Sequence, residues 1–378
     1  MPLVSFNNFY GKMQEYTQFF TFSGPPANVL QESNRIIRIS REYTTKGIGS
    51  STDMDNKETN TIKGSDKGFA VSAAMVIASA VLWGLYGTFV TILTSMGLAR
   101  NALVFLRMLG TSLPVGLLIC ATDRNAFRVR KADIPLYICN GLFSLLFFTF
   151  CYTAAIKVTK IATAAALLYT APAIVMVLSA ILFHEKMNAR KIFCCLLAVA
   201  GCAFASGLGG ELFAGGVLSG SAGSAASAAA SSGSLITPAG LLLGLGAGLG
   251  YALYSIFSRI ILNRGYSVYT NVFYSFGVAM IGFLVLSVMD GSFGQVFDSP
   301  SRTAVALLCG LLTGSLAYVL YTAGMKGMET SRAAQLTTIE PVTAALLGSL
   351  LFHQPLSFWE IVGIVMVVGS VVLMNAGA

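Results

Sequence analysis

Long apolar stretches separated by short charged segments dominate this chain. A helix that crosses the hydrocarbon core of a bilayer, about 30 Å thick, needs roughly 20 apolar residues. Runs of about this length, each with at most one internal charge, are found at 68–99, 101–122, 134–156, 161–184, 192–210, 237–258, 265–289, 303–325, 333–352 and 361–378. The runs do not alternate at every second residue, which favours helices over the strands of a membrane barrel. The pattern therefore predicts an all-α integral membrane protein with ten transmembrane helices.

Composition supports this prediction and excludes several classes of protein. Of the 378 residues, 55% are hydrophobic and 11% are charged, with a mean hydropathy of +0.73. Soluble domains carry about 25% charged residues, so an ordinary soluble enzyme and a disordered protein are both excluded. The net charge of +8 arises from short basic clusters between apolar runs. Because these clusters do not form one basic stripe, no nucleic-acid partner is expected.

The distribution of Lys and Arg predicts the topology. If the N-terminus is cytoplasmic, 19 basic residues lie on the inner side and four on the outer side. Basic residues concentrate on the cytoplasmic side of membrane proteins, so both termini are predicted to be cytoplasmic. Residues 1–67 are polar, with eight basic and seven acidic residues and no signal-peptide pattern; we expect a disordered cytoplasmic tail. The Gly/Ser/Ala-rich segment 208–235 is predicted to be a flexible external linker.

The linker separates two similar halves, 68–207 and 236–378. A shift of 169 residues aligns the ends of the halves, with 13 of 41 positions identical from Tyr152 to Ile192. A shift of 168 aligns their starts, so that Gly97 falls on Gly265. Each half has five predicted helices, and because five is odd, equivalent helices should cross the membrane in opposite directions. Such inverted repeats are typical of transporters, whose halves rock about a site near the bilayer midplane.

The chain resembles a known family at several of these positions. Three features carry the likeness: a Trp-Gly pair near the end of the first predicted helix, a proline near the middle of the fourth and ninth, with Phe-His-Glu closing the fourth, and a Glu-Pro pair in the ninth. These are Trp83-Gly84, Pro172, Pro341, Phe183-His184-Glu185 and Glu340-Pro341. With these features the chain resembles the drug/metabolite transporter superfamily, EamA type. The resemblance implies ten helices and transport of small metabolites such as amino acids or amines, more often outward than inward. One departure is that Glu185 of the first half is replaced by Gln354 in the second.

Two charges lie within the predicted spans, and such charges are expensive unless they have a function. Glu340 could take up a proton or bind a cationic group of a substrate, or it could be a structural carboxylate; we favour a function. Arg107 could bind a substrate carboxylate, or it could extend to the outer membrane interface, and the interfacial role is favoured. The depths of the two residues along their helices argue against a direct ion pair between them.

Aromatic residues complete the set of candidate site residues. Tyrosines in the middle of a span need a polar partner, so they are expected to line a water-filled cavity, with ordinary packing as the alternative. The candidates are Trp83, Tyr86, Tyr152, Tyr169, Tyr254 and Tyr321, together with Tyr251 and Tyr318 beside them. The pairs Tyr86/Tyr254 and Tyr152/Tyr321 are related by the repeat. Pro172 and Pro341 are candidates for helix breaks that free backbone carbonyls.

No catalytic residues, metal or cofactor are predicted. His184 and His353 should lie on opposite sides of the membrane, so we expect structural roles at helix ends. Glu185 is interpreted as an interfacial charge that fixes the turn after its helix. The Gly-rich stretch 240–250 indicates close helix packing and lacks both a P-loop lysine and a dinucleotide-binding pattern.

The sequence thus predicts a secondary transporter, not an enzyme, that works by alternating access. The expected partners are a small-molecule substrate, membrane lipid and a proton as a candidate coupling ion, and the expected location is a bacterial inner membrane. A nucleotide-sugar or phosphate-ester exchanger is an alternative, although it would need paired basic residues and the spans offer only Arg107. A membrane receptor or scaffold that signals through its tail is the other alternative. Oligomeric state cannot be derived from the sequence.

Overall fold

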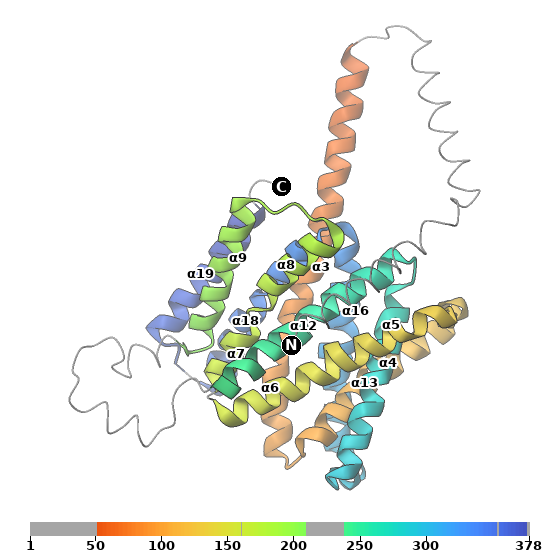
Figure 1. The fold of residues 1–378 in the computed structure, drawn as a ribbon, viewed down its shortest axis with the longest axis vertical. Coiled ribbons are helices and arrows are strands. Elements are labelled where there is room, and N and C mark those ends of the chain that lie inside the picture. Colours follow the sequence, from red (N-terminus) through yellow and green to blue (C-terminus); the bar gives the residue numbers. More distant parts are fainter. Residues whose placement is uncertain (1–50, 160, 209–237, 354, 376–378) are drawn as a thin grey trace, which may run out of the picture. The chain divides into compact units, whose positions relative to one another are not determined.

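The computed structural model describes residues 51–159, 161–208, 238–353 and 355–375. The chain divides into two compact parts, 1–65 and 66–378, and the packing described below belongs to the second. Within the described residues the regular structure is entirely helical (Figure 1). Most of the predicted linker, 209–235, and residues 1–50 of the predicted tail lie outside the described residues.

The main helices follow the apolar runs. In chain order they are α3 (Ser51–Ser95), α4 (Arg100–Thr122), α5 (Ile134–Cys139), η3 (Asn140–Leu146), α6 (Phe147–Val158), α7 (Ile161–Leu168), α8 (Ala171–Phe183), α9 (Ala189–Ala205), α12 (Pro238–Asn263), α13 (Val268–Met289), α15 (Pro300–Cys309), η5 (Gly310–Leu316), α16 (Ala317–Gly324), α17 (Thr330–Leu336), α18 (Ile339–Phe352) and α19 (Phe358–Asn375). The segments η3 and η5 are π-helices that continue the α-helices on either side of them. Short connecting helices are η1 (Arg124–Phe127), η2 (Lys131–Asp133), η4 (Ser292–Gly294), α14 (Gln295–Asp298) and η6 (Met325–Gly327).

Seven helical stretches are long and apolar enough to cross a membrane. They are Gly68–Ser95, Arg100–Thr122, Lys131–Val158, Thr163–Phe183, Pro238–Asn263, Val268–Met289 and Pro300–Gly327. The helix Phe358–Met374 is apolar but shorter. An all-helical membrane architecture follows from these stretches. The count of ten spans, the inverted topology and the cytoplasmic termini stay predictions.

Helix α3 begins before the first apolar run. Its first residue is Ser51, whereas the run begins at residue 68. The boundaries predicted for the tail, the two halves and the linker stay predictions.

Two helices pack against their own counterparts in the other half of the sequence. Helix α4 lies beside α13, and α9 lies beside α19 (Figure 1). The 168- and 169-residue shifts of the repeat relate the members of each pair. Equivalent elements contact each other in this way when a two-fold axis passes between them.

Local backbone conformation also repeats. His184 and His353 have φ values of 54° and 52°, and both end a helix in the left-handed conformation, the structural role expected for them. Gly97 and Gly265, which the repeat aligns, have φ values of 80° and 85°. Glycine adopts this conformation without the steric cost that a side chain imposes.

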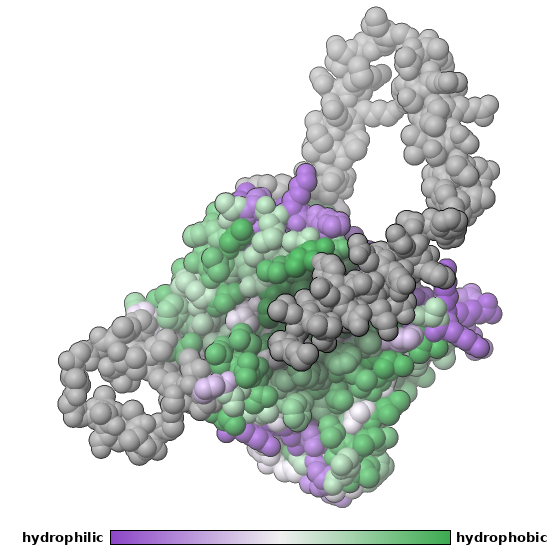
Figure 2. Space-filling view, in the orientation of Figure 1, coloured by the Kyte–Doolittle hydropathy of each residue, from purple (hydrophilic) through white to green (hydrophobic). Residues whose placement is uncertain are grey.

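Apolar side chains cover much of the surface of the helices. Figure 2 shows hydrophobic residues over most of the visible described face, with hydrophilic residues gathered at its margins. Leu242, Leu350 and Val365 have exposed fractions of 72%, 71% and 65%. Large apolar residues exposed on this scale are what lipid contact requires, because in a bilayer they meet hydrocarbon and not water.

Candidate functional site

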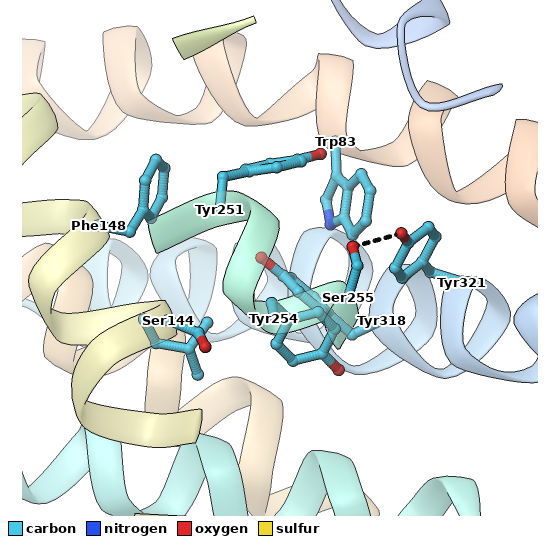
Figure 3. Close-up of a pocket in the computed structure, with 9 residues that line it drawn as sticks. Trp83, Ser144, Phe148, Tyr251, Tyr254, Ser255, Tyr318 and Tyr321 are labelled. Carbon is cyan, nitrogen blue, oxygen red and sulfur yellow. Dashed lines mark hydrogen bonds between the residues drawn. The ribbon is translucent and has the colours of Figure 1, made fainter. Parts of the chain in front are cut away.

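A small aromatic pocket lies among four helical segments, α3, α12, η3–α6 and α16 (Figure 3). The residues that line it are Trp83, Ser144, Leu145, Phe148, Tyr251, Tyr254, Ser255, Tyr318 and Tyr321. Its cavity volume is about 10 Å³, which is room for about one water molecule. A metabolite can therefore enter only if the helices around the pocket move apart.

Trp83 is the central ring of this pocket. Its ring centroid lies 4.8 Å from that of Tyr318, 5.2 Å from Tyr321 and 6.0 Å from Tyr251. Trp83 is only 5% exposed, and its indole Nε1 has no hydrogen-bond partner among the described residues. A buried indole N–H normally finds a partner, so this donor is available to a ligand in the pocket.

Hydrogen bonds orient the tyrosines around Trp83. The Tyr321 hydroxyl lies 2.6 Å from Ser255 Oγ (Figure 3). The Tyr254 hydroxyl lies 3.2 Å from Thr322 Oγ1. Tyr251, Tyr254 and Ser255 are on one face of α12, because residues three and four apart are neighbours on a helix. One face of α12 thus supplies a wall of the pocket.

Glu340 is joined to this pocket by Tyr251. The Tyr251 hydroxyl donates to Glu340 Oε2 at 3.1 Å. Gly84 of the Trp-Gly pair lets α3 approach α18 here, since a Cβ on Gly84 would lie 2.6 Å from Thr343 Cβ and 3.0 Å from the Glu340 carbonyl oxygen. The absence of a side chain at Gly84 therefore positions Glu340 close to the helix that carries Trp83.

The helix that contains Glu340 is interrupted, as is its counterpart. Helix α17 ends at Leu336 and α18 begins at Ile339, while α7 ends at Leu168 and α8 begins at Ala171. Each break lies just before a proline of the repeated pair, Pro341 or Pro172. Threonine hydroxyls bind carbonyls at the breaks: Thr337 to Ala334, Thr338 to Gln335 and Thr170 to Leu167, each at 2.7 Å. Such bonds satisfy backbone groups that a broken membrane helix leaves without partners.

Arg107 is buried in the bundle, which corrects the interfacial role favoured from the sequence. It is 8% exposed, and its Nε donates to Thr313 Oγ1 at 3.2 Å. One of its terminal nitrogens donates to the Thr313 carbonyl at 3.3 Å. The guanidinium lies 4.3 Å from the ring centroid of Tyr86, a cation–π contact. These contacts are inside the bundle because Arg107 is on the buried face of α4.

Three predicted tyrosines are not part of the pocket wall. Tyr86 lies under Arg107. Tyr152 stacks on Phe148, with 6.0 Å between the ring centroids, and Phe148 separates it from the pocket. Tyr169 packs against the cluster formed by Cys202, Val342 and Val367. Among the predicted candidates, the structure thus gathers Trp83, Tyr251, Tyr254, Tyr318 and Tyr321 in the pocket and joins Glu340 to it.

The sequence interpretation missed four of the residues that line the pocket. Ser144, Leu145 and Phe148 come from η3 and α6, and Ser255 comes from α12. Ser255 follows Tyr254 directly and could have been found from the spacing of Tyr251, Tyr254 and Ser255. The remaining three carry no charge and no special spacing, so only the packing of helices reveals them.

Glu185 also has a different role from the one expected. Its carboxylate accepts hydrogen bonds from the backbone N–H groups of Thr330 at 2.7 Å and Ser331 at 3.1 Å, and from the Ser331 hydroxyl. These groups are at the first turn of α17, whose free N–H groups attract a negative charge. Glu185 therefore joins the two halves of the sequence instead of fixing its own turn.

Comparison with known proteins identifies the family. The sequence pattern of the EamA-like transporter family matches residues 71–207 and 238–376. An uncharacterized transporter of Archaeoglobus fulgidus is 28% identical over 79% of this chain and 94% of its own length. The uncharacterized transporter YwfM of Bacillus subtilis is 24% identical over 81% of this chain and 94% of its length. A protein of known crystal structure, 15% identical, shares the fold with a TM-score of 0.65 over 81% of this chain and 98% of its own.

Proposed function

Because the chain belongs to the EamA-like transporter family, we propose that it is a secondary transporter that exports small organic metabolites such as amino acids or amines across a bacterial inner membrane. The two halves alternate access to a site between them. The family consists of transporters, which argues against the receptor or scaffold alternative.

The observation that supports this proposal best is the position of Glu340. Its carboxylate is held by Tyr251 at the edge of a pocket whose walls are aromatic rings. A carboxylate beside aromatic faces attracts an ammonium group by charge and by cation–π contact. Amines and amino acids share such a group.

Arg107 supplies the opposite charge, and it contacts the helix that carries Trp83. It lies on Tyr86, which is three residues after Trp83 on α3, so the two aromatic rings are on the same side of that helix. An amino acid carries an ammonium and a carboxylate, and the proposed site offers Glu340 for the first and Arg107 for the second. Arg107 was the less favoured candidate from the sequence, and its burial supports the substrate role.

Transport through this site is tested with the purified full chain in proteoliposomes. Flux of radiolabelled amino acids, amines, organic acids, phosphate esters and nucleotide sugars is measured with and without a pH gradient. We expect flux of an amino acid or an amine. Glu340→Gln should lower that flux at least tenfold and remove its dependence on the pH gradient.

A matched control is Glu360→Gln. Glu360 accepts a hydrogen bond from the Ser357 backbone N–H at the first turn of α19 and does not line the pocket. This variant should transport at the wild-type rate. Full flux and unchanged pH dependence in Glu340→Gln would overturn the role of Glu340, and transport of only phosphate esters or nucleotide sugars would favour the alternative substrate class.

A further inference from the structure

Two helix crossings in the bundle have the same geometry. Helix α4 crosses η5, and α13 crosses η3. A Cβ on Gly141 of η3 would lie 2.7 Å from the carbonyl oxygen of Ser275, and a Cβ on Gly310 of η5 would collide with the carbonyl oxygen of Arg107. The repeat relates Gly141 to Gly310 by 169 residues and Arg107 to Ser275 by 168. The two crossings are therefore structural equivalents.

The crossings differ in the charge that they contain. At one of them the Arg107 guanidinium binds the Thr313 hydroxyl. At the other, the counterpart of Arg107 is the neutral Ser275, and the counterpart of Thr313 is Ser144. Ser144 is 1% exposed and its Oγ has no hydrogen-bond partner among the described residues. At the first crossing the Thr313 hydroxyl binds the Arg107 cation, whereas at the second the Ser144 hydroxyl has no cation of the protein beside it within the described ranges.

Asn140 adds a second free oxygen at the neutral crossing. Its Nδ2 donates to Asn271 Oδ1 at 3.1 Å and to Ser275 Oγ at 2.8 Å, which fixes the orientation of the amide. The Asn271 amide in turn donates to Ser258 Oγ at 2.9 Å. Asn140 is completely buried, and its Oδ1 has no partner in the described part of the chain. Leaving a buried oxygen without a hydrogen-bond partner costs free energy, so we expect a ligand to bind here.

Both free oxygens belong to the same short π-helix. Asn140 and Ser144 are four residues apart in η3, a spacing that places two side chains next to each other on a helix. Single π-helical turns are frequent at functional sites. Neutral carboxamide and hydroxyl oxygens are ligands for hard cations, and no residue of this group carries a carboxylate that would balance a divalent charge. None of these groups takes up a proton near neutral pH.

We propose that Asn140 Oδ1 and Ser144 Oγ bind a monovalent cation, Na⁺, at the edge of the aromatic pocket. Asn271 and Ser275 are positioning residues, because they hold the Asn140 amide through its Nδ2. Ser144 also lines the pocket opposite Tyr321 (Figure 3), so the bound ion contacts whatever enters there. Water or substrate completes its coordination. Use of the ion in coupling rests on the proposed transport function, whereas ion binding does not.

The chain offers an internal reporter for this site. It has two tryptophans, Trp83 in the pocket and Trp359 in α19. In purified full-length Trp359→Phe, Trp83 is the one remaining indole, and its fluorescence is titrated with NaCl, KCl or choline chloride at constant ionic strength without substrate. We expect a saturable change with Na⁺ and none with choline. Thermal unfolding in the same salts should give a higher Tm in Na⁺, because a ligand that binds the folded state stabilises it.

Two variants locate the ion, and a third serves as the control. In the same background, Ser144→Ala and Asn140→Ala should raise the half-saturating Na⁺ concentration about tenfold or more, as loss of a ligand does. Ser179→Ala is the matched control, because Ser179 is also fully buried with an unpartnered hydroxyl, but on α8. It should titrate like the parent protein.

The outcomes separate ion binding from transport. Equal responses to Na⁺ and choline in both fluorescence and Tm would overturn the site. Water would then be the partner of the Asn140 and Ser144 oxygens. An unchanged Na⁺ titration in Ser144→Ala, the smaller of the two changes, would also overturn it, whether or not Asn140→Ala folds. Since no substrate is present, neither result bears on the proposed function. Conversely, failure of metabolite flux leaves the fluorescence titration intact.

Discussion

A buried charge has to find its stabilising partners within the protein, and Arg107 does so with one aromatic face and one threonine. Its planar guanidinium stacks on Tyr86 while two of its nitrogens bind Thr313. A lysine keeps the charge but has neither the plane nor the fixed directions of the donors. The two residues are therefore not interchangeable at this position.

This difference predicts a selective defect in Arg107→Lys. If the guanidinium binds a substrate carboxylate, the KM of Arg107→Lys for amino acids should rise about tenfold, which corresponds to a loss of roughly 1.4 kcal/mol of binding free energy. The KM for amines without a carboxylate should be unchanged. Initial rates in proteoliposomes give both values. Arg124→Lys, in the exposed turn after α4, is the control, and an equal rise for amines and amino acids would contradict the role of Arg107.

Asp290, at the end of α13, links α13 to the start of α4 and should respond to acid. Its carboxylate accepts hydrogen bonds from the Ser292 backbone N–H at 2.9 Å and from Asn101 Nδ2 at 2.6 Å. Hydrogen bonds from Ser292 lower the pKa of Asp290 from its usual value of 3.8. A lowered pKa in the folded state contributes stability above pH 3.8, and that stability is lost as pH falls through the lower folded value.

Asp290→Asn should therefore lack this part of the acid dependence. We expect a loss of less than about 1 kcal/mol at pH 7, because the group is exposed and screened. Between pH 5 and pH 3 the stability difference between wild type and variant should shrink. Thermal unfolding in detergent across this range measures it. A difference that stays constant down to pH 3 would show that Asp290 has the same pKa in both states.

At the scale of elements, glycines decide how closely the helices approach. Gly310 of η5 lies against α4, and a Cβ there would be 2.8 Å from Gly110 Cα and would collide with the Arg107 carbonyl oxygen. Both contacts are with backbone, which cannot swing away as a side chain can. The α4–η5 crossing therefore has to open if any side chain is introduced at Gly310.

Gly310→Ala should accordingly destabilise the protein by about 1–3 kcal/mol, the usual cost of overpacking. Gly87→Ala is the control. Gly87 is an exposed position of α3 with nothing within 4 Å of an added Cβ, so alanine should be neutral or slightly stabilising there. Each variant is heated in detergent, and the temperature at which it loses its monodisperse peak in size-exclusion chromatography is compared. Equal temperatures would mean that the crossing is looser than the structure indicates.

The apolar runs were sufficient to predict most of the helices, whereas side-chain neighbours on other helices were not predictable. The run 101–122 matches α4 within one residue, because charges and turns mark both of its ends. The bond between Tyr251 and Glu340 joins residues 89 positions apart. Distance along the sequence says nothing about such a contact, and hydropathy does not show that Arg107 faces the bundle. The unpartnered oxygen of Asn140 is likewise visible only once its neighbours are placed.

At the scale of the whole molecule, the two halves of the sequence are tied together where α8 ends. Glu185, from the first half, caps α17 of the second, and Lys191 of α9 binds Glu329 at 2.5 Å. Within the second half, Arg259 of α12 donates to Thr330 Oγ1 at 2.7 Å in the same place. Any rocking of one half against the other at this end has to break the contacts of Glu185 and Lys191. The repeat equivalent of Glu185 is Gln354, which cannot supply the same charge.

Removing the charge at Glu185 should therefore loosen α17. Glutamine keeps one acceptor oxygen but presents an N–H₂ group to N–H donors, and a hydrogen bond to a charged group contributes about 1.5–3 kcal/mol. In Glu185→Gln, hydrogen–deuterium exchange at the first turn of α17, Thr330 and Ser331, should become at least about tenfold faster. Lys186→Gln, which keeps the Glu185 carboxylate, should exchange like wild type. Unchanged exchange in Glu185→Gln would mean that the cap contributes little and that other contacts between the halves, such as Lys191 with Glu329, hold this end together.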